Sequence, residues 1–220
     1  MIISRSKGFM FLRGFKVGGT SVEAALLSVC GPDDIVDPQE PHLSPREARV
    51  LYPDDWVALR TLAIVRNPWD FSVAAAHHRY RLENPGQYKP EQAQDWMRQN
   101  FVRCMEEKLA CTASSAEFTR RESMTPTERH AYWVFGASFA TGDWFWLDEH
   151  GKPIEFDTVL RFESLEQDFL TLGLGPTLPK LNHFGYQSDP QSYRQYHTTR
   201  TRQIVEELHP YEILQFGYEF

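Results

Sequence analysis

The sequence predicts an α/β fold in which helices flank a mainly parallel central sheet. Short apolar runs with β-branched residues alternate along the chain with segments of helical pattern, and two of these runs lead directly into a helix start. Parallel strands need a crossover connection, which is usually a helix, so this alternation is typical of parallel sheets. The chain has 220 residues, 41% of them hydrophobic, which suits one folded domain over residues 1–220.

The first strand is predicted in the stretch 9–21, FMFLRGFKVGGTS, which begins with an apolar run. Gly18 and Gly19 let the backbone turn tightly and leave no side chain over the amide groups. Thr20 and Ser21 then stand where a helix, TSVEAALLSV, would begin, and either hydroxyl could cap it. The stretch therefore predicts a strand, a glycine turn and a helix in succession.

Lys16 suggests that this turn also binds an anion. A lysine beside a helix N-terminus suits a phosphate-like anion, since the terminal N–H groups and the helix dipole both favour negative charge. The nucleotide-binding P-loop pattern does not match, because Lys16 precedes the glycine pair and does not follow it. An ordinary turn with one solvated lysine is the alternative.

Two further helices are predicted from their N-terminal signals. Ser44 is followed by a proline and then by Glu47, which is the spacing of a capping box. Thr125, again with a proline next and Glu128 three residues on, repeats the device. The Pro-bearing acidic stretch 31–41, GPDDIVDPQEP, is interpreted as a surface loop.

The second strand-to-helix switch is the clearest one. Residues 60–66, RTLAIVR, form a short apolar run typical of a buried parallel strand. Asn67 as cap and Pro68 in the first turn then predict a helix at once. Ligands of such sheets bind outside the carboxyl ends of the strands. Lys16 and Arg66 both lie at such ends, which favours an anion site there.

The last third of the chain predicts more of the same alternation. Residues 144–156, WFWLDEHGKPIEF, suggest a hairpin or paired strand around Glu149, His150 and Gly151. Residues 157–162, DTVLRF, predict a strand, and 163–174, ESLEQDFLTLGL, a helix with one apolar face.

Composition excludes several classes of function. The net charge of −7 argues against a general nucleic-acid binder and against binding to anionic membranes. The three cysteines form no C-x-x-C pair and no even framework, which suits reduced thiols in a cytoplasmic protein. The sequence shows neither a signal peptide nor an apolar run of bilayer length, so we expect no membrane association.

The chain resembles the sulfotransferase family, in particular small members allied to the carbohydrate 2-O-sulfotransferases. Those proteins carry a loop of the type PKTGGTS, a strand ending VRNPYDR, a segment of the type GRFENLEEDF, then LPxLN and a tail FGYEF. The corresponding segments here, in the same order, are FKVGGTS, VRNPWDF, LRFESLEQDF, LPKLN and FGYEF. The matches run from about residue 9 to residue 220, which is nearly the whole chain.

The resemblance implies a P-loop-like sulfotransferase fold and a sulfuryl donor, 3′-phosphoadenosine 5′-phosphosulfate (PAPS), with 3′,5′-adenosine bisphosphate (PAP) as product and no metal. Lys16 would reach the oxygen that bridges phosphorus and sulfur, where negative charge develops. Arg66 would hold the 3′-phosphate, which suits a planar guanidinium. The 5′-phosphosulfate would lie on the backbone amides of Gly18, Gly19, Thr20 and Ser21.

Two positions depart from the family pattern. The family usually places a second 3′-phosphate ligand, a serine, where this chain has Ala74. Ser72 is nearby in sequence but two residues away on a helix, about 200° around it, so we do not transfer the role to it. Arg194 or Arg200 could supply the contact instead. Val17 stands where the family commonly has threonine, which removes a hydroxyl but leaves the backbone cradle.

The acceptor hydroxyl needs a base, and histidine is the usual choice. His42 lies between the two donor loops in sequence, as the catalytic histidine does in carbohydrate 2-O-sulfotransferases. Glu40 is the alternative base, another histidine is a further one, and His42 could also be a surface residue. Phe162 could pack against the adenine or belong to the core.

The sequence thus predicts an enzyme that transfers a sulfuryl group to a hydroxyl-bearing acceptor, a carbohydrate or a small metabolite. A P-loop-like kinase that uses ATP is one alternative, opposed by the misplaced lysine and by the lack of an evident magnesium ligand after the glycines. The other alternative is a catalytically silent nucleotide-binding protein on the same fold, because Ala74 lacks the hydroxyl that contacts the 3′-phosphate of the sulfuryl donor in the family.

Overall fold

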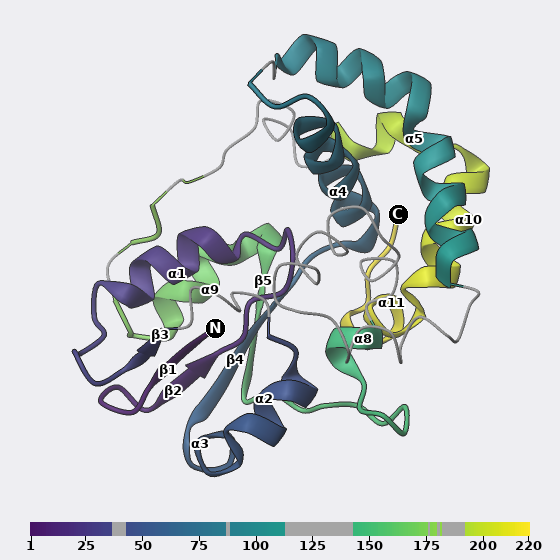
Figure 1. The fold of residues 1–220 in the computed structure, drawn as a ribbon. Coiled ribbons are helices and arrows are strands. Elements are labelled where there is room, and N and C mark those ends of the chain that lie inside the picture. The colour runs from purple at the N-terminus through teal and green to yellow at the C-terminus, as the bar shows by residue number, and fades with distance from the viewer. Residues whose placement is uncertain (37–42, 87–88, 113–142, 176, 180, 182–191) are drawn as a thin grey trace. The chain divides into compact units, whose positions relative to one another are not determined.

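The computed structural model describes residues 1–36, 43–86, 89–112, 143–175, 177–179, 181 and 192–220. Its contacts divide the chain into two compact units, and each is described by itself. Unit 1 comprises residues 1–66 and 144–183, and unit 2 comprises residues 67–143 and 184–220. Elements carry the labels of Figure 1. That the whole chain acts as one domain stays a prediction.

Unit 1 contains a mixed, mostly parallel sheet, as the sequence predicted. Among the described residues its strands are β1 (Ile2–Ser4), β2 (Phe9–Phe11), β3 (Ile35–Val36), β4 (Arg60–Val65) and β5 (Thr158–Arg161), in the order β3-β1-β2-β4-β5. The pairs β2–β4 and β4–β5 are parallel, whereas β1 runs antiparallel to both of its neighbours. All of these strands except β1 therefore point in one direction.

Two of these strands, β1 and β3, were not predicted from the sequence. The stretch 31–41 was expected to be a surface loop, but Ile35 and Val36 pair with β1. Neither β3 nor β1 is long enough to show an alternating pattern, and their pairing is set by partners remote in sequence. β4 and β5 match the strands predicted at residues 60–66 and 157–162.

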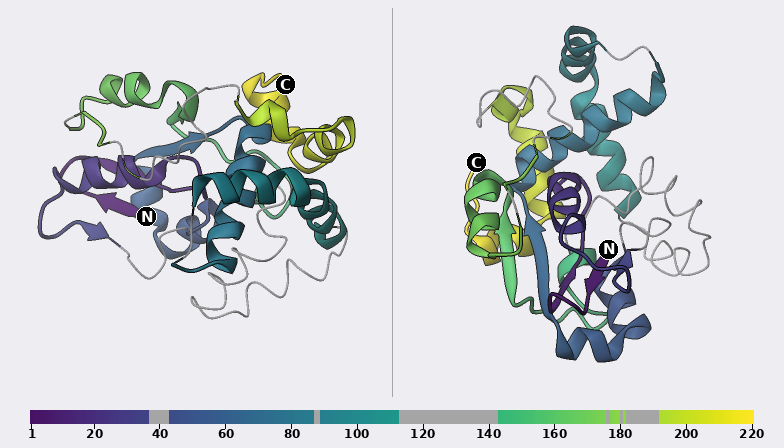
Figure 2. Two further views of the ribbon diagram at one scale, coloured as in Figure 1. Left: turned by 90° about the horizontal axis from the view of Figure 1, so that it is seen from above. Right: turned by 90° about the vertical axis from the view of Figure 1, so that its left-hand side faces the viewer.

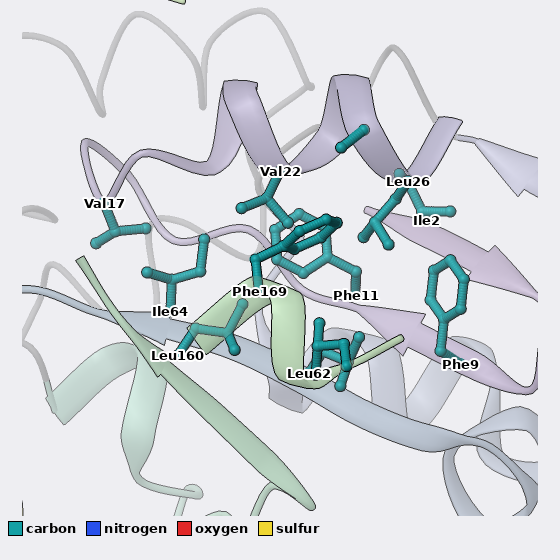
Figure 3. Packing of buried hydrophobic residues seen from close by; sticks show 12 residues of the cluster. Ile2, Phe9, Phe11, Val17, Val22, Leu26, Leu62, Ile64, Leu160 and Phe169 are labelled. Carbon is teal, nitrogen blue, oxygen red and sulfur yellow. The ribbon is translucent and has the colours of Figure 1, made fainter. Parts of the chain in front are cut away.

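Helices α1 and α9 cover one face of the sheet. α1 spans Gly19–Leu27 and α9 spans Leu165–Thr171, preceded by the 3₁₀ turn η2 (Phe162–Ser164). Their apolar faces interlock over alternate residues of the strands, and Figure 3 shows this cluster. The labelled side chains are Ile2, Phe9, Phe11, Val17, Val22, Leu26, Leu62, Ile64, Leu160 and Phe169. Each such side chain stabilises the fold by about 1.5–3 kcal/mol, which makes this cluster the main anchor of α1.

Helices α2 (Pro45–Leu51) and α3 (Pro53–Ala58) lie on the other side of the sheet in Figure 1. The predicted capping box is confirmed: Ser44 accepts from the Glu47 N–H, and the Glu47 carboxylate accepts from the Ser44 N–H at 2.8 Å. The helix predicted from Thr125 lies outside the described residues.

The segment 144–156 is only partly the predicted hairpin. Its first half folds as the short helix α8 (Asp143–Trp146), and the pairing is reduced to an isolated bridge between Leu147 and Pro153. The Asp148 carboxylate accepts from the N–H groups of His150 and Lys152 at 2.9 and 2.8 Å. Because this side chain closes the turn, a long strand ladder is not needed to hold it.

Unit 2 is helical in its described residues. Its elements are α4 (Pro68–Glu83), α5 (Pro90–Thr112), η4 (Ser192–Tyr196), α10 (Thr199–Leu208) and α11 (Pro210–Phe216). α4, α5 and α10 pack against one another, as the views in Figure 2 also show. The predicted cap of α4 is confirmed, since the Asn67 side chain accepts from the N–H groups of Trp69 and Asp70. Among the described helices, none is both long and apolar enough to cross a membrane.

His197 is built into the aromatic interior of unit 2. Its ring meets those of Phe101 and Phe220 edge to face, with centroids 4.9 and 5.4 Å apart. Its Nε2 lies 3.1 Å from the carbonyl oxygen of Trp69. Burial lowers the pKa of His197 to about 4, so the folded protein holds this ring neutral at pH 7.

We expect unit 2 to lose stability in mild acid through this histidine. Its pKa is lower in the folded state than the unfolded value of about 6.5, so the unfolded chain binds the proton first. The contribution is complete above pH 6.5 and falls as the pH drops toward 4, reaching a loss of about 2 kcal/mol by pH 5. Urea unfolding at pH 7.5 and pH 5, compared between wild type and His197→Gln, measures it. A variant with the same pH dependence as wild type would contradict this assignment.

Candidate anion-binding site

The site lies where β2 and β4 end, at one edge of the sheet in unit 1. The two strands are parallel neighbours, and the Leu12 N–H just beyond β2 donates to the Leu62 carbonyl at 2.9 Å. The chain that leaves β2 goes on to β3, on one side of this pair, and the next strand after β4 is β5, on the other side. Such a reversal is the switch point at which open α/β sheets bind ligands.

The turn after β2 has a left-handed backbone at two positions. Gly18 has φ +83° and Lys16 has φ +53°. A glycine adopts this conformation without penalty, but a lysine pays about 1–2 kcal/mol for it. Strained non-glycine residues of this kind occur preferentially at functional sites. The sequence predicted a tight turn here but not the strain at Lys16.

Helix α1 begins one residue earlier than the sequence predicted. Gly18 is its N-cap, without a side-chain hydrogen bond, so Thr20 and Ser21 lie in the first turn and do not cap it. The Ser21 N–H donates to the Gly18 carbonyl at 3.1 Å, and the Ser21 hydroxyl accepts from the Leu181 N–H at 3.3 Å. Gly18 and Gly19 therefore form the turn at the start of α1, where the sequence predicted a capping hydroxyl. The first turn also carries no acidic side chain, which leaves the positive end of the dipole unopposed there.

Arg66 connects the end of β4 to this turn. Its side chain is buried, with 5% of the residue's surface exposed, and its Nη1 donates to the Lys16 carbonyl oxygen at 2.6 Å. Its guanidinium also stacks on the Phe162 ring, with Cζ 3.9 Å from the ring centroid. The guanidinium is therefore held by two contacts, one with the aromatic face and one with the carbonyl oxygen.

Phe162 in turn contacts the glycine turn. A Cβ placed on Gly18 would lie 2.9 Å from Cδ2 of Phe162 and 2.9 Å from Cδ2 of Leu165. Both distances are too short for real carbon atoms, so only glycine fits between the turn and η2. Phe162 was a candidate partner for adenine; in this structure one face of its ring carries the Arg66 guanidinium.

Gly19 is restricted by a different neighbour. A Cβ there would overlap Cγ of Arg13, whose guanidinium forms an ion pair with Glu23 of α1. Glu23 thus balances the charge of Arg13. Lys16 and Arg66 are two further cationic residues at the ends of these strands, and the α1 N-terminus adds a partial positive charge. The Lys16 ammonium lies 5.7 Å from the centroid of the Phe15 ring.

Sequence reasoning missed Arg13 and gave Phe162 a different role. Arg13 lies within the apolar stretch that leads to the turn, where it stands out as a charge in an otherwise buried strand exit. That contrast was a usable signal. Nothing in the local sequence pairs Phe162 with Arg66, because the contact depends on β4 and β5 lying side by side.

Several other candidate residues lie in unit 2 or outside the described part of the chain. His42 and Glu40, the two candidate bases, lie outside the described residues. Ala74 and Ser72 are buried within α4 of unit 2, and the Ser72 hydroxyl donates to the Trp69 carbonyl at 2.8 Å. That bond gives a physical reason for leaving Ser72 out of the site.

Arg194 and Arg200, the candidate substitutes for the family serine, are also in unit 2. Arg200 forms a two-pronged hydrogen bond with Glu106 at 2.8 and 3.1 Å. Arg194 lies over the Phe220 ring, with Cζ 5.3 Å from its centroid. Arg200 is thus paired with a carboxylate, and which of the two arginines could replace the family serine stays open.

Within the part of the chain that the structure describes, no group of three or more His, Cys, Asp or Glu side chains is arranged to hold a metal ion. Comparisons of this chain with protein-family profiles, with curated proteins and with solved structures found no match.

Proposed function

We propose that the chain is a sulfotransferase of P-loop-like fold, organised as a single domain, that moves a sulfuryl group from PAPS to an acceptor hydroxyl. The observation that carries the proposal is the hydrogen bond from the Arg66 guanidinium to the Lys16 backbone carbonyl, which joins the ends of two parallel strands. Two cationic residues in the segments that end these strands, one of them just before a helix N-terminus at a switch point, suit a ligand with two separate anionic groups. PAPS is such a ligand.

The residues divide the work between binding and chemistry. The N–H groups of Gly19 and Thr20, at the start of α1, would hold the 5′-phosphosulfate, since a helix start leaves its first N–H groups without intrahelical acceptors. The Ser21 N–H, which was also expected to do so, already donates to the Gly18 carbonyl. Arg66 would hold the 3′-phosphate through charge-assisted hydrogen bonds. Lys16 would stabilise the charge that develops on the bridging oxygen as the sulfur–oxygen bond breaks.

The acceptor is proposed to be a carbohydrate or a small metabolite that carries a hydroxyl. Its attack on sulfur requires that the hydroxyl proton leave, and His42 is the proposed base, with Glu40 as the alternative. Both residues lie outside the described part of the chain and precede in sequence α2, whose start is fixed by the Ser44 capping box.

If His42 is the base, we expect His42→Ala to lose about 100-fold or more in turnover while the affinity for PAP stays near normal. Turnover is measured as PAP released from PAPS, and affinity by calorimetry. Glu40→Gln is the matched comparison, because it tests the other candidate base, two residues earlier in the sequence. A fully active His42→Ala would transfer the role to Glu40 or to another histidine.

The donor assignment is tested by calorimetry with PAP, AMP and ATP. We expect PAP to bind about 10- to 100-fold more tightly than AMP, since the 3′-phosphate adds hydrogen bonds to a charged group worth about 1.5–3 kcal/mol. Arg66→Met should remove most of that difference. Equal affinity for PAP and AMP would refute the role of Arg66, and a preference for ATP with magnesium would favour a kinase.

A further inference from the structure

Phe162 lies at the centre of the candidate site without touching Lys16 in any contact described above. It opens η2 directly after β5, and its ring stands between the Gly18 turn and the Arg66 guanidinium. One face of the ring carries the guanidinium, and its Cδ2 and Cε2 atoms face Gly18. The ring is thus the common neighbour of the two loops that the proposed function requires.

Two contacts hold the Arg66 side chain. The ring of Phe162 supports the guanidinium from one face, since a cation lies most favourably over the face of an aromatic ring. The Nη1 group donates to the Lys16 carbonyl oxygen, 2.6 Å away. Lys16 has the strained left-handed backbone, φ +53°, and a hydrogen bond to its carbonyl opposes relaxation of that conformation.

We propose that Phe162 is a positioning residue: it holds Arg66, which in turn holds the left-handed turn from Lys16 to Gly18. The consequence for catalysis rests on the proposed function, but the effect on the turn does not. Without the aromatic face, the Arg66 guanidinium can move away from its place over the ring. Its hydrogen bond to the Lys16 carbonyl then weakens, and the backbone of Lys16 can change its conformation. The ring acts through these two residues and needs no contact with the donor.

The first test uses the ligand-free full chain. Phe162→Leu keeps an apolar side chain but removes the π face, and we expect it to change the HN–Hα coupling of the Lys16 amide signal, which depends on φ and not on the ring current of the lost ring. Phe162→Tyr keeps the face and should restore the wild-type coupling. The control is Phe169→Leu in α9, which loses a ring from the same core and should leave that coupling in place. An unchanged coupling in Phe162→Leu would overturn the proposal.

The second test asks whether Phe162 acts through Arg66. We expect Phe162→Leu to weaken PAP binding and to lower turnover, each about tenfold, with rescue by Phe162→Tyr. Arg66→Lys keeps the charge but loses the planar stack, so the double variant should be no worse than Arg66→Lys alone. Losses that multiply in the double variant would instead show independent roles.

The two proposals fail in different ways. If wild-type protein does not bind PAP, the sulfotransferase assignment falls, whereas the Lys16 coupling still tests Phe162. If PAP binds and Phe162→Leu binds it equally well with an unchanged turn, the donor assignment stands and the positioning role is lost.

Discussion

Lys16→Ala is expected to lower turnover by about 30- to 1000-fold while the affinity for PAP changes only a few-fold. This corresponds to about 2–4 kcal/mol in the barrier, the size of effect seen when one preorganised group that stabilises developing charge is deleted. The loss falls on turnover because the bridging oxygen gains most of its charge in the transition state and little in the bound donor. Turnover is measured as PAP release from PAPS, and affinity by calorimetry.

The left-handed backbone of Lys16 provides a matched control. Lys16→Gly removes the same ammonium group as Lys16→Ala but also relieves the strain at φ +53°, so it should be more stable by about 1 kcal/mol. Equal loss of turnover in the two variants would assign the effect to the ammonium. Lys7→Ala, at an exposed lysine in the turn between β1 and β2, should change neither quantity. If Lys16→Ala keeps full turnover, the turn is structural and the proposed chemistry has no cation at its centre.

What the sequence predicted well is what local patterns determine. The strand at residues 60–66, the Asn67 cap and the Ser44–Glu47 capping box all depend on residues within one turn of each other. A side chain can satisfy a neighbouring N–H wherever the helix packs, so these signals survive folding. The same reasoning brought Lys16 and Arg66 to one edge, because parallel strands end at the same edge.

What the sequence could not predict depends on contacts between remote segments. The burial of Arg66 and its stack on Phe162 follow from the pairing of β4 with β5, which no window around either residue records. The strain at Lys16 is equally invisible, since lysine is not a residue that favours φ above zero. The start of α1 was misplaced because Thr20 and Ser21 are residues that favour capping positions. In the structure Gly18 is the N-cap, and the helix begins at Gly19, one residue before the predicted start.

The conformation of Gly18 leads to the second large effect. Gly18→Ala is expected to weaken PAP binding by more than about 100-fold and to destabilise the protein by about 2–5 kcal/mol. Two costs add: the left-handed backbone at φ +83° costs an alanine about 1–2 kcal/mol, and overpacking costs about 1–3 kcal/mol. The overpacking arises because the new Cβ would lie 2.9 Å from both Phe162 and Leu165.

Gly8 separates these two costs. It also has a positive φ, +71°, but a Cβ there would meet nothing within 4 Å. Gly8→Ala is therefore destabilised by the backbone term alone and should leave PAP binding unchanged. The additional loss of stability in Gly18→Ala then measures the packing of the turn against Phe162 and Leu165. Thermal unfolding and calorimetry on both variants give the comparison. The binding loss should follow displacement of the turn and not general unfolding, because the protein remains folded at 25 °C if its stability is ordinary. Equal stability losses in the two variants, with PAP binding intact in both, would mean that the contact of Gly18 with Phe162 does not hold the anion-binding turn.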